Sequence, residues 1–207
     1  KNGLVVALDG IENPHNQGAI LRSCAYFAAK GLIVPNSGTV TGITPSAARM
    51  AEGGWESVPI YSSSDLSSSL RDLREQGWCV VGADLSAKES LSSAKITFPT
   101  VLVFGNEQKG LSERVKRRCD TLVNIPGKGD MQSLNVSVAA GIMLAGLDRR
   151  RNSDKKYKKT KPPKCEDQQS CEWVKKQGKK PGHCKNKSKS KSLSKSLKKT
   201  KKKFELK

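Results

Sequence analysis

Short apolar runs alternate with amphipathic stretches through the first 150 residues of this 207-residue chain. Short runs rich in valine, leucine and isoleucine predict buried strands, whereas apolar residues that repeat every three or four positions predict helices. The predicted strands lie at 4–8, 32–34, 58–61, 79–83, 101–104 and 122–125, and the predicted helices at 18–29, 45–52, 65–76, 112–118 and 134–147. This alternation predicts an α/β fold with a mostly parallel sheet flanked by helices.

Polar residues at the starts of three predicted helices support these boundaries. Thr44 stands before Pro45, the arrangement of an N-cap followed by a first-turn proline. Ser64 and Ser112 are the expected caps of the next two helices.

The last predicted helix, LNVSVAAGIMLAGL, is apolar around most of its circumference and rich in small residues. A helix of this kind is buried on more than one side. We expect the sheet to cover one side and a second subunit to cover another.

Three of the strand-like runs break into glycine, asparagine and acidic residues, within 4–18, 100–110 and 121–135. In an open α/β sheet, ligands collect at the carboxyl ends of the strands, where glycine-rich loops let the main chain approach a small molecule. Three such loops in one domain therefore predict a single composite site.

Two common nucleotide-binding motifs are missing from the sequence. The first loop, DGIENPHNQGAILRS, lacks the G-x-G-x-x-G fingerprint that a dinucleotide fold needs after its first strand. GNEQKG places Lys109 in the wrong frame for a Walker loop. Nicotinamide dinucleotides and nucleoside triphosphates are therefore disfavoured as ligands.

Charge divides the chain in two. Residues 1–148 hold 14 Lys+Arg and 14 Asp+Glu, whereas 149–207 hold 24 against 5, which is the whole net charge of +19. The second part has few aliphatic residues and cannot bury enough surface to offset chain entropy. We therefore predict a folded domain at 1–150 and a disordered, lysine-rich tail at 151–207 that favours a polyanionic partner.

Compartment is indicated only coarsely. No apolar run approaches the ~20 residues that span a bilayer, and nothing resembles a signal peptide. The chain opens with Lys1 rather than Met, so its natural start is expected further upstream. Cys24, Cys79 and Cys119 lie in or beside apolar runs, as reduced, partly buried thiols do, which predicts an intracellular location without separating cytoplasm, nucleus or organelle.

The tail also holds a group of potential metal ligands with the spacing C-x5-C-x11-H-C. Zinc favours a tighter pair of cysteines, and an adjacent His-Cys pair rarely ligates one ion, so no metal site is predicted. These residues are Cys165, Cys171, His183 and Cys184.

The three loops resemble the motifs of the SpoU (TrmH-like) group of SPOUT methyltransferases, which methylate ribose 2′-hydroxyls in RNA. The first motif matches NQGAILRS at 16–23, and the second FGNEQKGL at 104–111. The third matches Ile125 and Pro126, followed by SLNVSVA at 133–139. The motifs follow in the family's order and spacing, and the resemblance covers roughly residues 3–147.

This resemblance implies more than the residue pattern does. It implies a deep trefoil knot in the C-terminal half of the domain, a homodimer through the knot, S-adenosyl-L-methionine as cofactor and ribosomal or transfer RNA, rather than DNA, as partner. Main chain around Gly105, Ile125 and Leu134 is expected to contact the adenosine. By position, the implied cofactor residues are Phe104, Gly105, Asn106, Gly110, Ile125, Pro126, Ser133 and Leu134.

Arg22 occupies the position of the family's catalytic residue, which acts on the 2′-hydroxyl together with an RNA phosphate. A guanidinium normally stays protonated, so clamping phosphate and stabilising alkoxide charge is its easier role, and the identity of the base stays open. His15 lies beside the predicted site and is either a direct contact or a polar loop residue.

The remaining implied catalytic residues have supporting roles. Asn16 is expected to fix Arg22 and its loop, or to cap a helix. Glu107 is expected to hold Arg22 or the third loop by a charge-assisted bond. Ser133 is the expected cap of the last helix, with Asn135 directed at substrate.

The predicted function is S-adenosylmethionine-dependent 2′-O-methylation of ribosomal or transfer RNA. Two alternatives stay open: an inactive RNA-binding or ribosome-assembly protein on the same scaffold, and a basic interaction protein whose tail is the functional part. Many members of this group carry a separate RNA-binding domain, and here we expect the tail to supply general phosphate contacts.

Overall fold

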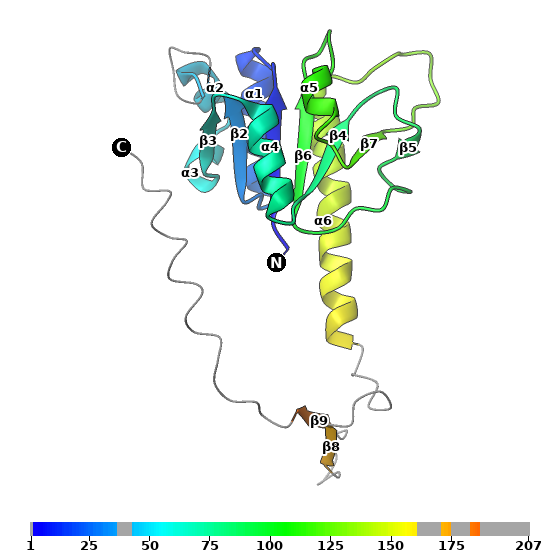
Figure 1. Ribbon diagram of the computed structural model, residues 1–207. Helices are drawn as coiled ribbons and strands as arrows, with labels where there is room; N and C mark the ends of the chain where they lie inside the picture. Colours follow the sequence, from blue (N-terminus) through cyan, green and yellow to red (C-terminus); the bar gives the residue numbers. More distant parts are fainter. Residues whose placement is uncertain (1, 37–42, 161–170, 175–182, 187–207) are drawn as a thin grey trace. The chain divides into compact units, whose positions relative to one another are not determined.

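A single sheet of parallel strands organises the domain. The computed structural model describes residues 2–36, 43–160, 171–174 and 183–186, with side chains as far as residue 153. Within these residues, the main sheet has seven strands in the order β3-β2-β1-β6-β4-β7-β5, and every pairing is parallel (Figure 1). The strands are β1 (Leu4–Asp9), β2 (Gly31–Pro35), β3 (Ile60–Ser63), β4 (Cys79–Ala83), β5 (Glu89–Ser90), β6 (Thr100–Gly105) and β7 (Thr121–Asn124). The predicted α/β class is confirmed.

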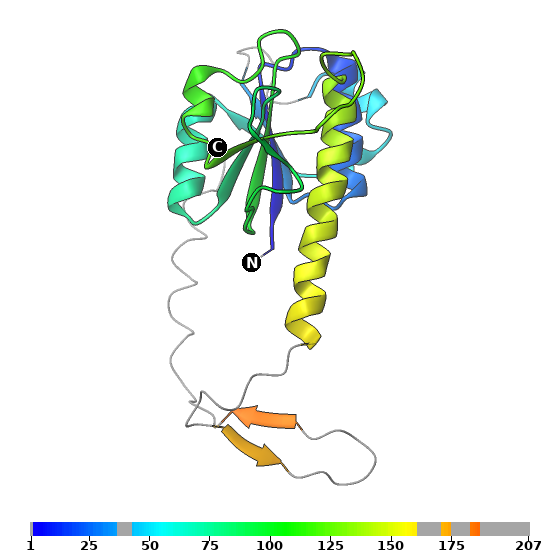
Figure 2. The ribbon, with the colours of Figure 1, turned by 90° about the vertical axis from the view of Figure 1, so that its right-hand side faces the viewer.

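Helices cover both faces of the sheet. On one face, α1 and α6 lie side by side, with α2 and α3 beyond α1; α4 and α5 cover the other face (Figure 2). The helices are α1 (Pro14–Tyr26), α2 (Pro45–Met50), α3 (Gly54–Ser57), α4 (Leu66–Glu75), α5 (Glu113–Lys116) and α6 (Val136–Thr160).

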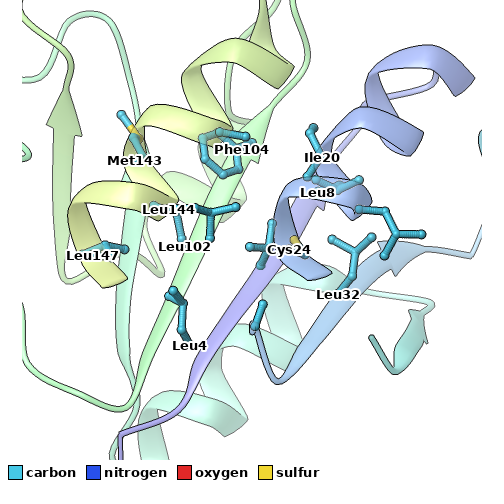
Figure 3. Packing of buried hydrophobic residues seen from close by; sticks show 14 of the residues in the cluster. Leu4, Leu8, Ile20, Cys24, Leu32, Leu102, Phe104, Met143, Leu144 and Leu147 are labelled. Atoms are coloured by element: carbon cyan, nitrogen blue, oxygen red, sulfur yellow. The ribbon is translucent and has the colours of Figure 1, made fainter. Parts of the chain in front are cut away.

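The larger core lies between the sheet and the α1–α6 layer. Leu8 of β1, Ile20 and Cys24 of α1, Phe104 of β6 and Leu144 of α6 are buried there together (Figure 3). Burying side chains of this size stabilises a fold by about 1.5–3 kcal/mol each. The core therefore fixes α1 and α6, which carry two of the three motif loops, against the two strands at the centre of the sheet.

The register of the central strands brings the first two motif loops together. β1 pairs with β6 along its whole length, so that Asp9 lies opposite Gly105 at the carboxyl edge. The loop after β1 and the loop after β6 therefore leave the sheet as direct neighbours, although they are far apart in sequence.

The first helix begins at Pro14 rather than at residue 18 and ends at Tyr26 rather than 29. Asn13 is its cap, because Asn13 Oδ1 accepts a hydrogen bond from the His15 amide at 2.9 Å. The prediction followed the apolar periodicity and missed the cap-and-proline signal in Asn13-Pro14. Asn16 therefore lies inside the first turn and is not the cap.

The other predicted caps are confirmed in part. Thr44 accepts a bond from the Ala47 amide at 3.2 Å and caps α2. For α4 the cap is Asp65, not Ser64, and Asp65 accepts from the Ser67 amide at 3.1 Å. Ser112 occupies the cap position of α5 without a side-chain bond there.

The last helix runs to Thr160, well past its predicted end at 147. The prediction stopped where the apolar pattern stops, but arginine and lysine are good helix formers. Arg151 is only 7% exposed, donates to the Phe27 carbonyl at 2.9 Å and pairs with Asp148. The folded unit accordingly extends to Asp154, beyond the predicted boundary at 150.

Two further strands lie within the predicted tail, β8 (Cys171–Val174) and β9 (His183–Asn186), which pair antiparallel. Together with the end of α6, they show that the tail is not structureless throughout its described part. For the rest of the tail, which lies outside the described residues, disorder stays a prediction. The candidate ligands Cys165, Cys171, His183 and Cys184 lie outside the residues whose side chains are described.

The thiols of the folded unit are free, as expected. Burial raises the pKa of Cys24 to about 12, and burial, with a smaller contribution from Asp120, raises that of Cys119 to about 12. Both thiols are therefore protonated and unreactive near neutral pH. No helix among the described residues is long and apolar enough to cross a membrane.

Candidate active site

Asn16 joins the three motif loops at the carboxyl edge of the sheet. Its Nδ2 donates to Glu107 Oε1 at 2.5 Å, and its Oδ1 accepts from Asn135 Nδ2 at 3.1 Å. The bonded partners are 91 and 119 residues away in sequence. The three loops therefore meet, as predicted: one residue from each takes part in a continuous chain of side-chain hydrogen bonds.

Asn135 has two tasks in this network. While its Nδ2 bonds to Asn16, its Oδ1 accepts from the Ser137 amide at 2.8 Å and from the Ser137 hydroxyl at 2.6 Å. Asn135 therefore caps α6, and the prediction that Ser133 is the cap is wrong. Ser133 is exposed in the loop before the helix, where it is free to contact a ligand.

Glycine is required where β6 ends. A β-carbon on Gly105 would lie 2.2 Å from the carbonyl carbon of Gly110 and 2.3 Å from the nitrogen of Leu111. Both are main-chain atoms that cannot rotate away. The second loop thus folds directly back on its own strand, and Gly110 makes this possible with a φ of +67°.

Asn106 holds this loop closed and ties it to the first loop. Its main chain exchanges two hydrogen bonds with Gly110, at 3.0 and 2.8 Å. Its Oδ1 accepts from the amides of Gln108 and Lys109, and its Nδ2 donates to the Gly10 carbonyl at 2.8 Å. Asn106 was predicted as a cofactor residue; in the structure its side chain is used to shape the loop.

Arg22 lies on the exposed side of α1 and is not part of the network. Its guanidinium pairs with Glu52 at 2.8 Å, and the two side chains are 58% and 64% exposed. The predictions that Glu107 or Asn16 holds Arg22 are therefore wrong. Glu107 bonds to Asn16 instead. The partner of Arg22, Glu52, was not predicted from the sequence, where its only distinguishing feature is that two glycines, Gly53 and Gly54, follow it.

The candidate cofactor residues differ in what they can offer. The Phe104 side chain is buried in the core, so only its main chain can reach a ligand. Ile125 is half-buried, whereas Pro126, Ser133 and Leu134 are exposed. Main-chain groups and small apolar surfaces thus line the carboxyl edge, a composition suited to a nucleoside.

A groove of about 710 Å³ lies between the 91–98 segment and α6, and Ile125 and Pro126 after β7 also line it. Of the predicted cofactor residues, only Ile125 and Pro126 line it. Arg150 closes its side by donating to the carbonyls of Ala94 (3.0 Å) and Ser92. No group of three or more histidine, cysteine or acidic side chains gathers as a metal site among the residues described.

The comparison with known proteins identifies the domain that carries this network. Residues 3–145 match the SpoU rRNA Methylase family, over well more than half of the chain. The chain belongs to the SpoU rRNA Methylase family.

Named tRNA and rRNA methyltransferases align with about 70% of this chain. An uncharacterized tRNA/rRNA methyltransferase of Mycolicibacterium smegmatis is 41% identical over 150 residues, which cover 72% of this chain and 48% of the relative. The 23S rRNA (guanosine-2′-O-)-methyltransferase RlmB of Nitrosomonas europaea is 38% identical over 141 residues, covering 68% and 54%. This chain thus spans about half the length of these relatives.

Solved SpoU structures have the same architecture. AviRb from Streptomyces viridochromogenes, in complex with AdoMet, superposes with a TM-score of 0.67 at 30% identity, covering 74% of this chain and 59% of AviRb. The TrmH/SpoU tRNA modifying enzyme of A. aeolicus gives 0.68 at 30% identity, covering 79% and 83%. Each likeness thus covers about three quarters of this chain.

Proposed function

We propose that this chain transfers the methyl group of S-adenosyl-L-methionine to a ribose 2′-hydroxyl of ribosomal or transfer RNA. The observation that carries the proposal is the Asn135–Asn16–Glu107 chain of hydrogen bonds, which unites the three SpoU motifs at one edge of the sheet. The relatives support it, since RlmB is named as a guanosine-2′-O-methyltransferase and AviRb was solved with AdoMet.

The residues at the edge fit the proposed cofactor. The main chain at Gly110 is exposed and that at Gly105 is partly exposed, while Ile125 and Leu134, the latter 48% exposed, offer apolar surface for an adenine. S-adenosylmethionine supplies an electrophilic methyl group on a sulfonium. The carboxylate of Glu107 lies at the same edge and is suited to a neighbouring positive charge.

Arg22 is assigned to the acceptor. A guanidinium offers five donors, and Glu52 engages one nitrogen, Nη1, so the other donors are available to a phosphate or to a developing alkoxide. Orienting the ribose and stabilising its oxyanion lowers the barrier to methyl transfer without requiring the guanidinium to lose a proton.

Labelled cofactor and total RNA test the proposal. Transfer should yield alkali-resistant methylated dinucleotides, and Arg22→Ala should lower the rate at least about 100-fold, with calorimetric cofactor affinity nearly unchanged. Arg71→Ala, an exposed arginine on α4 across the sheet, is the matched control and should retain the rate. Cofactor binding without transfer to any RNA would instead favour an RNA-binding protein on this scaffold.

We propose further that α6 is the dimer interface and that its passage knots the chain. Val138 and Ile142, 50% and 44% exposed, form an apolar strip on the surface of α6, which supports a dimer. Two contacts support the knot. Leu91 packs against Gly146 of α6, and Arg150 of α6 donates hydrogen bonds to the carbonyls of Ser92 and Ala94. Both contacts hold α6 against the segment that connects β4 to β6, which is the segment that α6 would pass under in a knotted chain. Ile142→Glu should halve the mass seen by sedimentation; an unchanged mass would contradict the dimer.

The charge of the tail supports a general role in RNA binding. Residues 149–207 carry the whole net charge of +19, while the rest of the chain is neutral. Basic residues in such a number add salt-dependent affinity for phosphate, whatever the RNA sequence. The choice of nucleotide then falls to the surface around Arg22.

A further inference from the structure

An exposed tryptophan lies on α3, the short helix that packs against α1 at Arg22. Trp55 follows Gly54 in α3, and its side chain is 53% exposed. A β-carbon on Gly54 would lie 3.3 Å from the Cα of Arg22 and 3.4 Å from the Cβ of Ala25. α3 therefore packs against the turn of α1 that carries Arg22, and Trp55 is the next residue of α3 after this contact.

The backbone before Trp55 is held in an unusual conformation. Glu52 has a φ of +46° and Gly53 a φ of +81°, so that two successive residues are left-handed. For a residue with a β-carbon this conformation costs about 1 kcal/mol. The turn presents the Glu52 carboxylate to Arg22 and then brings Gly54 against α1. It thus fixes Trp55 next to the proposed acceptor site.

A nucleobase suits this position. The acceptor ribose is assigned to Arg22, and its own base or the next one along the strand lies within one nucleotide of that arginine. Single-stranded RNA is commonly bound by stacking bases on aromatic side chains while arginines contact phosphate. An indole has the largest flat apolar surface of any side chain, and half of this one is already covered by the protein, which limits its entropy loss on binding.

A second copy of the chain is the competing occupant. The apolar strip of α6 lies across α1 from α3: Ser23 Oγ is 3.9 Å from a β-carbon built on Gly141 of α6, whereas α3 contacts Arg22 and Ala25. α1 therefore lies between that apolar strip and the helix that carries Trp55 (Figure 2). We propose that Trp55 is a stacking platform for an RNA base adjacent to the methylated ribose, an inference that rests on the proposed function.

The affinities of the full chain for two polyanions distinguish the contribution of base stacking from that of charge. The probes are single-stranded oligoadenylate and inorganic polyphosphate of similar charge, because only the first carries bases. Trp55→Leu, which keeps an apolar side chain, should weaken oligoadenylate binding roughly 5- to 150-fold and leave polyphosphate binding unchanged. Trp55→Phe should recover most of the loss. Tyr61→Leu on β3, an equally exposed aromatic at 53%, should change neither affinity.

Three results would contradict the stacking role, and each differs from a failure of the proposed function. Equal oligoadenylate affinity in Trp55→Leu and the unmodified chain would overturn the stacking role, as would an equal loss with polyphosphate. A change of sedimenting mass in Trp55→Leu would assign the indole to a subunit interface. These results would leave methyl transfer by the unmodified chain intact, whereas absence of transfer to any RNA would overturn the proposed function itself.

Discussion

Two functional regions on one helix are built in opposite ways. Asn16, in the first turn of α1, is 8% exposed and bonds to residues from both other motif loops. Arg22 lies six positions further along the same helix, is more than half exposed and pairs with the exposed carboxylate of Glu52. The first region is complete within the protein, whereas the second presents donors to the solvent.

The difference follows from what each region has to bind. A cofactor of fixed shape is best held by a site whose loops are already in place, since ordering them on binding would reduce affinity. An RNA phosphate brings its own charge and geometry, so the arginine that receives it must be accessible. A surface ion pair contributes about 0–1 kcal/mol, and Glu52 can thus steady Arg22 yet be displaced by phosphate.

The largest expected effect is in the three-loop region. Gly105→Ala forces a β-carbon to within 2.4 Å of three main-chain atoms and should destabilise the fold by about 4 kcal/mol or more, with loss of cofactor binding. Gly127→Ala, where nothing lies within 4 Å, is the control, and Gly54→Ala beside Arg22 should stay within about 1 kcal/mol. Chemical denaturation measures all three. Similar losses for Gly105→Ala and Gly54→Ala would erase the contrast between the regions.

The hydrogen-bond network should show clear coupling. In a double-mutant cycle with Asn16→Ala and Glu107→Ala, we expect the pair to contribute about 1–3 kcal/mol to unfolding free energy, because an amide bonds to a carboxylate at 2.5 Å. Asn16→Ala alone should also lower methyl transfer, since it frees the loop of Asn135. A coupling near zero would mean that the three loops hold their places independently.

The smallest effect is expected at the exposed pair. The same cycle with Arg22→Ala and Glu52→Ala should give less than about 1 kcal/mol, and the value should fall further as salt is added. Glu52→Gln should keep the fold and modestly tighten RNA binding, because one anion no longer competes for the guanidinium. A coupling energy as large as that of Asn16 and Glu107 would show that Glu52 holds Arg22 too firmly for an RNA phosphate to displace it.

The prediction of the fold was most accurate where local pattern and tertiary packing agree. Each of the six apolar runs predicted as strands overlaps a strand of the sheet, and Thr44 caps its helix. The start of α1 was predicted wrongly because the cap-and-proline signal of Asn13-Pro14 was given less weight than the apolar periodicity. The end of α6 was predicted too early because residues after 147 keep a high helix propensity after the apolar pattern has ended. The two-residue strand β5 (Glu89–Ser90) has no apolar pattern and was not predicted.

The meeting of the three loops was predicted correctly, but the hydrogen bonds between their side chains were not. Asn16, Glu107 and Asn135 were expected to act together, yet their partners were assigned wrongly: Asn135 caps α6 in place of Ser133, and Arg22 pairs with Glu52 instead of Glu107. Which side chains bond depends on loop geometry to within an ångström. Residue spacing along the chain does not carry that information.

The sequence by itself determined the alternation of strands and helices, the three loops at the carboxyl edge and the division of charge between domain and tail, because these follow from local residue chemistry. Only the tertiary structure decided that Asn16 connects all three loops, that Arg151 belongs to the folded unit and that Glu52 pairs with Arg22. Those contacts join residues up to 124 positions apart. Their geometry comes from strand register and helix packing, which no short stretch of sequence encodes alone.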